Sequence, residues 1–320
     1  AAEHTWNTIL AFVAKDLIHP PLFYIFLKLW IAIGGESLVW LRLLPLLFAV
    51  AAVVPFLLLC RELRANAWTR MIAFLLFAVN GPLIKYAQEV RMYSLLLCLS
   101  LFSMWLFVKY FHKGKSLRIL VIVNILLVYS HYFGWFVVLS EVAAIVIFQR
   151  IKVRAILIMF AISALAFAPW AAAVMIEANA GSQLGQNIGW MVRPGVAQLL
   201  QLAFGMFEPF YFPGSSAEPL TILTISVPIL LGLTAGLIVG IINDRQIERE
   251  KFETKRLLAI FVALPVFAAF VLSWVLPYSI WGTRHLIIVF VPAALFVTSL
   301  IGRISYATLK TVIVAVLCAI

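Results

Sequence analysis

Charged residues are scarce in this sequence. Only 12% of its 320 residues are Asp, Glu, Lys or Arg, whereas 65% are hydrophobic and the mean hydropathy is +1.09. A typical soluble domain has about 45–50% apolar and about 25% charged residues. A soluble fold of this length could not bury so much apolar surface, so the composition excludes that class. It predicts an all-α, polytopic membrane protein.

Aspartate is rarer still, with Asp16 and Asp244 as the two examples. The sequence has no Asp-x-Asp pair to hold a metal with a nucleotide diphosphate, and it has no Gly-x-x-x-x-Gly-Lys or Gly-x-Gly-x-x-Gly motif. These absences speak against ATP-driven transport and against nucleotide-sugar chemistry. The three cysteines, Cys60, Cys98 and Cys318, lie in or beside apolar segments, where neither a disulfide nor a zinc site is expected.

Apolar runs of about 20 residues, with shorter ones tolerated inside bundles, are typical of membrane-spanning helices. We expect a single transmembrane helical bundle over residues 1–320, with about ten spans and a first span that lies before Ala1. Two short spans meet at Ser130-His131. The expected spans are Val39–Cys60, Thr69–Tyr86, Met92–Phe111, Leu117–Tyr129, Tyr132–Phe148, Ala155–Val174, Leu220–Ile242, Leu257–Leu276, His285–Ile301 and Ile304–Ile320.

Lys and Arg predict the orientation of these spans. Of the 24 Lys and Arg residues, 16 lie in alternate loops, around residues 61–70, 109–118, 150–154, 243–256 and 303. The positive-inside rule places these loops in the cytoplasm. The net charge of +11 is therefore mainly an orientation signal and does not indicate nucleic-acid binding.

Two exterior segments carry further helices. Residues 1–38 contain the apolar stretch Leu22–Ile33, which is too short to span comfortably and follows Pro20-Pro21, so we expect a juxtamembrane helix there. Residues 175–219 form a long loop, interpreted either as a functional lid or as a structural belt of interfacial aromatics. An amphipathic helix in this loop is predicted from the apolar residues Val196, Leu199, Leu200, Ala203, Phe204 and Phe207.

Ionisable residues gather at the exterior face in four clusters, at residues 16–19, 85–93, 129–132 and 281–285. Because all four lie on one side of the membrane, they can converge. A carboxylate there could act as a general base, and Lys or Arg could bind a phosphate. The alternative for each residue alone is snorkelling to lipid headgroups or local pairing, such as Lys85 with Glu89.

Glu141 stands apart from these clusters. It lies near the middle of an expected span, where a charged side chain is costly. Two interpretations are open, a functional or pairing role and a protonated, hydrogen-bonded packing role. The sequence indicates no partner for it.

Several runs resemble the polytopic GT-C glycosyltransferases, in particular the protein O-mannosyltransferases and the aminoarabinose transferases that modify lipid A. The resemblance covers nearly the whole chain, and the combination of His-Pro-Pro with Gln-Glu-x-Arg-x-Tyr is its most specific part. The matching runs are Asp16-Leu-Ile-His-Pro-Pro-Leu-Phe-Tyr, Leu41-Arg-Leu-Leu-Pro, Tyr86-Ala-Gln-Glu-Val-Arg-Met-Tyr-Ser, Tyr129-Ser-His-Tyr-Phe-Gly and Thr283-Arg-His-Leu-Ile.

This resemblance implies an inverting glycosyltransferase of the plasma (inner) membrane. Such an enzyme moves a sugar from a polyprenyl-phosphate donor to a hydroxyl or phosphate of a lipid, glycan or protein acceptor at the extracytoplasmic face. A carboxylate takes the acceptor proton during attack on C1, and the lipid phosphate leaves with its charge held by Arg or Lys. A divalent cation is left open, and no other cofactor is implied.

The resemblance also implies roles for individual residues. Glu89 takes the family's second acidic position and Asp16 is a further catalytic candidate, while the principal Asp is expected before Ala1. The implied ligands of the donor phosphate are Arg91, Lys85 and Arg284, and the implied site-lining residues are His19, His131, Tyr93 and His285. The alternatives are a polytopic transporter or lipid flippase, with Glu141 as the coupling acid, and a structural subunit that holds a partner enzyme.

Overall fold

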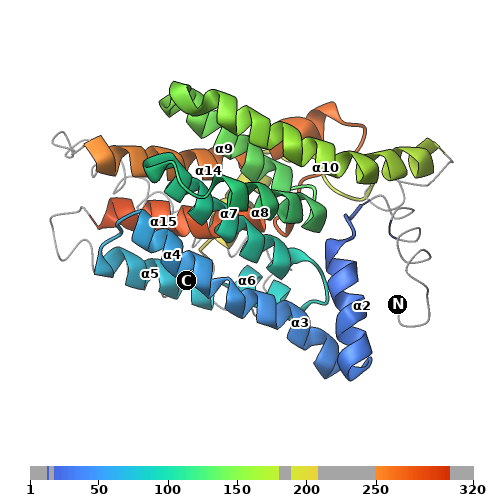
Figure 1. Cartoon of the computed structure of the whole chain (residues 1–320). Helices are drawn as coiled ribbons and strands as arrows, with labels where there is room; N and C mark the ends of the chain where they lie inside the picture. Colours follow the sequence, from blue (N-terminus) through green and yellow to red (C-terminus); the bar gives the residue numbers. More distant parts are fainter. Residues whose placement is uncertain (1–12, 14–17, 180–188, 208–248, 303–320) are drawn as a thin grey trace. The chain divides into compact units, whose positions relative to one another are not determined.

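A computed structural model describes residue 13 and residues 18–179, 189–207 and 249–302 of the chain (Figure 1). Among these residues no strand occurs, which confirms the all-α class. Asp16 and the expected spans Leu220–Ile242 and Ile304–Ile320 lie outside the described residues. The chain divides into two compact units, and each draws on three stretches of sequence. The single-domain expectation therefore stays a prediction.

The first unit comprises Ala1–Glu62, Tyr86–Pro194 and Ala263–Ile288. At its centre lies α7 (Tyr93–Lys113), which packs against α3, α4, α8 and α9. The residues of α7 are apolar on all sides, which is typical of a helix surrounded by other helices. Around it are α2 (Leu22–Gly34), α3 (Leu38–Ala51), α4 (Val53–Glu62), α8 (Leu117–Ser130), α9 (Gly134–Phe148) and α10 (Val153–Asn179).

Helix α2 crosses the direction that α3, α7, α8 and α10 share (Figure 1). It begins directly after Pro21, as the sequence predicts for a first-turn proline. The Trp30 and Trp40 rings stack with centroids 4.3 Å apart, and each indole N–H donates to the other residue's carbonyl, at 2.7 and 2.9 Å. A β-carbon at Gly34 would collide with the Trp40 ring. These contacts fix the angle between α2 and α3, while the juxtamembrane position of α2 stays a prediction.

Within the described residues, four helical segments are long and apolar enough to cross a membrane: Leu38–Glu62, Tyr93–Lys113, Arg150–Asn179 and Glu253–Val275. The first joins α3 and α4, and the last belongs to α14 (Arg249–Val275). Other apolar helices are shorter, with α8 at 14 residues and α9 at 15. The helices thus support a membrane protein, whereas the count of ten spans is not confirmed.

The second unit comprises Leu63–Lys85, Gly195–Val262 and Val289–Ile320. Its core joins α5 (Ala67–Val79) and α15 (Phe290–Ile301), with Ile72, Leu76, Ala294 and Ile301 buried together. It also contains α12 (Val196–Gly205) and the start of α6 (Gly81–Gln88). A helix is therefore present in the long loop, while its amphipathic, exterior placement stays a prediction. Its most buried residue is Leu202, however, which lies outside the predicted apolar face.

The expected span Thr69–Tyr86 is wrong as a single helix, because it breaks at Asn80. This residue has an extended backbone, with φ −62° and ψ 120°, between α5 and α6. Its side-chain amide donates to the carbonyls of Gly205 and Met206, both at 3.1 Å, and its oxygen accepts from the Leu83 N–H. These bonds stabilise the break, and they also turn the end of α12 toward Asn80.

Three basic segments meet at one end of the first unit. Lys113 Nζ lies 2.6 Å from Glu62 Oε2, which brings the end of α7 to the end of α4. Lys152 Nζ donates to the carbonyls of Phe111 and Tyr110, at 2.5 and 3.2 Å. Such cations are stabilising at a helix C-terminus, where carbonyls lack partners. The contacts agree with a common side for these loops, and the identity of that side stays a prediction.

Candidate functional site

Three histidines and a tyrosine meet at the other end of α7. Tyr93 opens α7, His19 precedes α2, His131 joins α8 to α9, and His285 begins the short helix η3 (His285–Val289). The His131 ring centroid lies 5.9 Å from that of His19 and 5.2 Å from that of His285, and Tyr93 lies 6.2 and 6.3 Å from His131 and His285. All four side chains are buried. The structure therefore brings together all four residues predicted to line the site.

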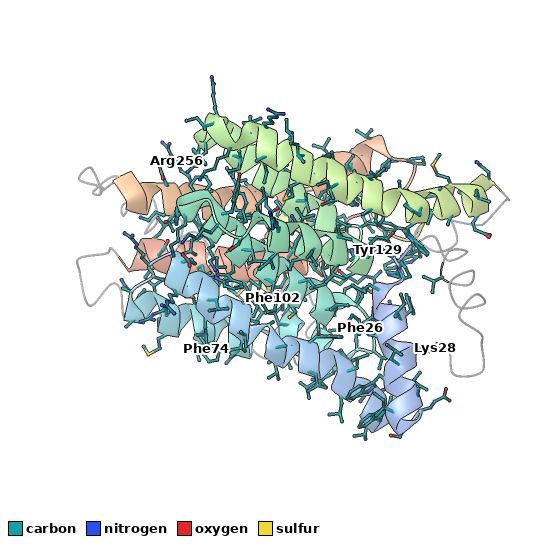
Figure 2. All side chains as sticks on the ribbon, in the orientation of Figure 1. Phe26, Lys28, Phe74, Phe102, Tyr129 and Arg256 are labelled. Atoms are coloured by element: carbon teal, nitrogen blue, oxygen red, sulfur yellow. The ribbon has the colours of Figure 1, made fainter. Side chains whose placement is uncertain are left out.

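The ends of the surrounding helices hold this cluster in place. Tyr129, labelled in Figure 2, lies two residues before His131 near the end of α8. Its hydroxyl donates to the Ala166 carbonyl of α10 at 2.8 Å. At the start of α9, a β-carbon on Gly134 would lie 2.8 Å from the Leu127 carbonyl oxygen. This close approach lets the chain reverse sharply at His131.

His131 is a neutral hydrogen-bond donor. Its Nδ1 accepts the backbone N–H of Phe133 at 3.1 Å, so the ring hydrogen is on Nε2. Burial holds the pKa of His131 well below its ordinary value, with smaller contributions from the charges of His285, His19 and Arg284. Among the described residues, the buried Nε2 has no hydrogen-bond partner. His131 can therefore offer this N–H to a ligand oxygen.

His285 has the complementary arrangement. Its Nδ1 lies 3.3 Å from the Ile280 carbonyl, which can only accept, so the hydrogen is on Nδ1 and Nε2 is an acceptor. A β-carbon at Gly282 would lie 3.1 Å from this nitrogen, closer than most side chains allow. The site thus pairs a donor imidazole with an acceptor imidazole.

Arg284 is a cation whose charge acts on these rings. Its guanidinium lies 5.0 Å from the centre of the Trp190 ring, over the ring face. Its charge acts on Tyr86, His131 and His285. The N–H edge of the guanidinium has no hydrogen-bond partner among the described residues. This edge has the geometry for bidentate binding of a phosphate.

The segment that carries Trp190 is fastened to the turn before η3. The indole N–H of Trp274 donates to the Pro194 carbonyl at 3.0 Å, and the Ser279 hydroxyl donates to the Val192 carbonyl at 2.9 Å. Trp190 itself is 64% exposed. The two bonds hold this part of the long loop against the residues that include Arg284.

Glu89 and Arg91 share the turn between α6 and α7. The Arg91 backbone N–H donates to the Glu89 carbonyl at 2.7 Å, and the Arg91 side chain is exposed with its charge near Tyr93, Glu89 and Tyr24. The Glu89 side chain is half-buried and its charge acts on Tyr86. A carboxylate and a guanidinium therefore stand at the edge of the histidine cluster.

Tyr86 is a site residue that the sequence analysis did not single out. Burial raises its pKa to about 12, although a hydrogen bond with Thr283 lowers it in part. Tyr86 is thus neutral, and its ring centroid lies 5.1 Å from that of Tyr93. Thr283 and Trp190 were also missed. Tyr86 and Thr283 stand inside matched motifs, which is the signal that could have found them.

Two of the predicted site residues are not placed with this cluster. Lys85 is half-buried on α6 and belongs to the second unit, and Asp16 lies outside the described residues. Within the described part of the chain, no group of three or more His, Cys, Asp or Glu side chains is placed to hold a metal ion. The divalent cation therefore stays open.

Comparisons with known proteins bear on the fold. The sequence matches no protein-family model and no curated protein. The structure is similar to the crystal structure of the Archaeoglobus fulgidus oligosaccharyltransferase in complex with Zn and sulfate, with a TM-score of 0.55 and 17% identity. The match covers 94% of this chain and 42% of that one, so this chain spans less than half of that protein's length. At this identity the likeness supports a GT-C type of fold and no more.

Proposed function

We propose that the chain is an inverting glycosyltransferase that moves a sugar from a polyprenyl-phosphate donor to an acceptor hydroxyl or phosphate. The transfer takes place at the extracytoplasmic face of the plasma membrane. The observation that carries this proposal is the convergence of Arg284, Arg91 and Glu89 on the buried histidine cluster, in a fold of the GT-C type. The named solved protein is itself a glycosyltransferase, which agrees with the proposal.

Each group has a defined task in this reaction. The guanidinium edges of Arg284 and Arg91 hold the donor phosphate and stabilise the charge that it gains as it leaves. Glu89 accepts the proton of the acceptor hydroxyl while that oxygen attacks C1 of the sugar. The neutral His131 N–H donates to an uncharged oxygen of the substrate. A lipid carrier brings the donor from within the membrane, so no nucleotide site is required.

The direct test is transfer by the purified, membrane-reconstituted protein. Radiolabelled polyprenyl-phosphate hexoses and aminopentoses are supplied together with a membrane lipid and glycan extract, and release of polyprenyl phosphate is measured. We expect release with at least one donor and its loss in Glu89→Gln. Absence of release with every donor, together with absence of polyprenyl-phosphate binding, would contradict the proposed function.

A further inference from the structure

The most deeply buried acid of the described chain is part of a closed set of contacts. Glu141 on α9 is 0% exposed, as are Ser103 on α7 and Asn124 on α8. Ser103 Oγ lies 2.6 Å from Glu141 Oε1 and 2.5 Å from Asn124 Oδ1. Asn124 Nδ2 lies 2.6 Å from Glu141 Oε2. The three side chains therefore form a closed ring, and each of its three edges is a short contact between two of them.

Counting protons fixes the state of this ring. Each edge needs one hydrogen, because two oxygens without a proton between them repel at such distances. The Ser103 hydroxyl supplies one hydrogen, and the amide nitrogen of Asn124 takes part in one edge and supplies a second. The third must come from the carboxyl of Glu141. Exchanging the oxygen and nitrogen of Asn124 leaves the count unchanged, so the result does not depend on the orientation of that amide.

Among the described residues, no charged side chain acts on Glu141 to favour its ionised form. Its polar contacts come from Ser103 and Asn124, and the second hydrogen of the Asn124 amide points to Met159 Sδ on α10, 3.4 Å away. An isolated buried carboxylate is far more costly than a neutral, fully hydrogen-bonded acid. A neutral acid satisfies every donor and acceptor in the ring.

The ring joins the three helices whose ends form the candidate site. Ser103 lies ten residues after Tyr93, Asn124 seven before His131, and Glu141 seven after Gly134. At 1.5 Å per helical residue, the ring lies about 10–15 Å along these helices from the site. Each residue takes part in two of the three edges, so a sliding movement of any one helix would break two of them.

We propose that Glu141 is protonated and acts as a positioning residue, closing a hydrogen-bonded ring with Ser103 and Asn124 that fixes the register of α7, α8 and α9. This role does not depend on which reaction the site performs. It differs from the coupling acid of a transporter, which must release its proton in each cycle.

The protonation state is tested by infrared difference spectroscopy of the whole chain in detergent at neutral pH. We expect the wild-type spectrum to contain a protonated-carboxyl C=O band that is missing in Glu141→Gln. The Gln amide has the shape of the protonated acid and can donate to Ser103, so its Tm should equal that of the wild type. A missing band difference, or a Tm drop in Glu141→Gln as large as in Glu141→Ala, would overturn the proposal.

The positioning role is tested by hydrogen exchange at the α8–α9 junction, in peptides that contain His131. Ser103→Ala should accelerate exchange there, whereas Glu141→Gln should leave it unchanged. Ser100→Ala is the matched control, because Ser100 is also 0% exposed on α7 and its hydroxyl donates only to the Leu97 carbonyl. Equal exchange in the Ser103 and Ser100 variants would overturn the role.

Discussion

The two ends of the first unit use their charges differently. At the basic end, Lys113 is paired with Glu62, and Lys152 donates to two carbonyls at the end of α7. At the other end, Arg284 stacks on Trp190 but has no hydrogen-bond partner for its N–H groups among the described residues. The His131 Nε2 hydrogen is also without a partner there.

This difference distinguishes charges that stabilise the fold from charges that are available to bind a ligand. Cations that complete helix ends or surface pairs contribute to stability and orientation. Buried donors and stacked guanidiniums without partners are more costly to keep, and they gain most from a ligand that supplies oxygens. The comparison therefore supports our proposal that a ligand binds at the end that contains the histidine cluster.

The largest effect is expected from Glu89→Gln. Glu89 is the carboxylate that we propose takes the proton of the acceptor hydroxyl, so its removal should reduce transfer by about 10²-fold or more, the usual range for an acid–base group. The half-buried side chain should tolerate the amide, so Tm should be unchanged. Steady-state transfer rates check the expected loss of activity, and thermal unfolding checks the expected Tm. A wild-type transfer rate in Glu89→Gln would remove Glu89 from the mechanism.

Arg284→Ala is expected to come next. Hydrogen bonds to charged groups contribute about 1.5–3 kcal/mol, so losing them should weaken use of the phosphate-bearing donor by about tenfold or more in kcat/KM. Arg284→Lys retains the charge without the bidentate edge and should give an intermediate value. Equal kcat/KM in all three proteins would exclude Arg284 from donor binding.

Trp190→Ala should have a smaller effect through Arg284. An exposed cation–π contact contributes about 0.5–1 kcal/mol, which corresponds to about a two- to fivefold loss of donor affinity. Trp190→Phe keeps an aromatic face and should retain most of the donor affinity. If Trp190→Ala weakens the Arg284→Ala protein as much as the wild type, the effect does not act through Arg284.

Lys113→Ala should give the smallest effect, and at the basic end. The Lys113 side chain is 53% exposed, and pairs of this kind contribute about 0.2–1 kcal/mol to stability. Chemical unfolding should register a change of this size, and it should shrink at high salt. Donor use should be unaffected. A tenfold loss of transfer in Lys113→Ala would contradict the claim that the charges of the basic end serve stability and orientation only.

Local chemistry made part of this arrangement predictable. Short sequence patterns predicted where two helix boundaries lie, at the proline pair before α2 and at Ser130-His131. The convergence of the histidines was predicted from the placement of their motifs on one side of the membrane. The dipeptide Gly81-Pro82, a known break signal, could have indicated the break at Asn80, but the sequence analysis did not use it.

Long-range contacts could not be predicted in the same way. Asn80 bonds to carbonyls about 125 residues away, and Glu141 finds its partners on two other helices. Asn124 is a lone amide in an apolar span, and this is the one sequence signal that could have indicated a partner for Glu141. Neither pairing is encoded by a local pattern, because each depends on how the helices pack.

The most direct test of the central claim removes two positive charges from either end and measures polyprenyl-phosphate binding by native mass spectrometry. The Arg91→Ala/Arg284→Ala protein is compared with Lys113→Ala/Lys152→Ala, which loses the same charge. The account predicts that the wild type and the lysine variant retain the lipid, while the arginine variant loses it. Equal retention by both variants, or loss from the lysine variant alone, would contradict it.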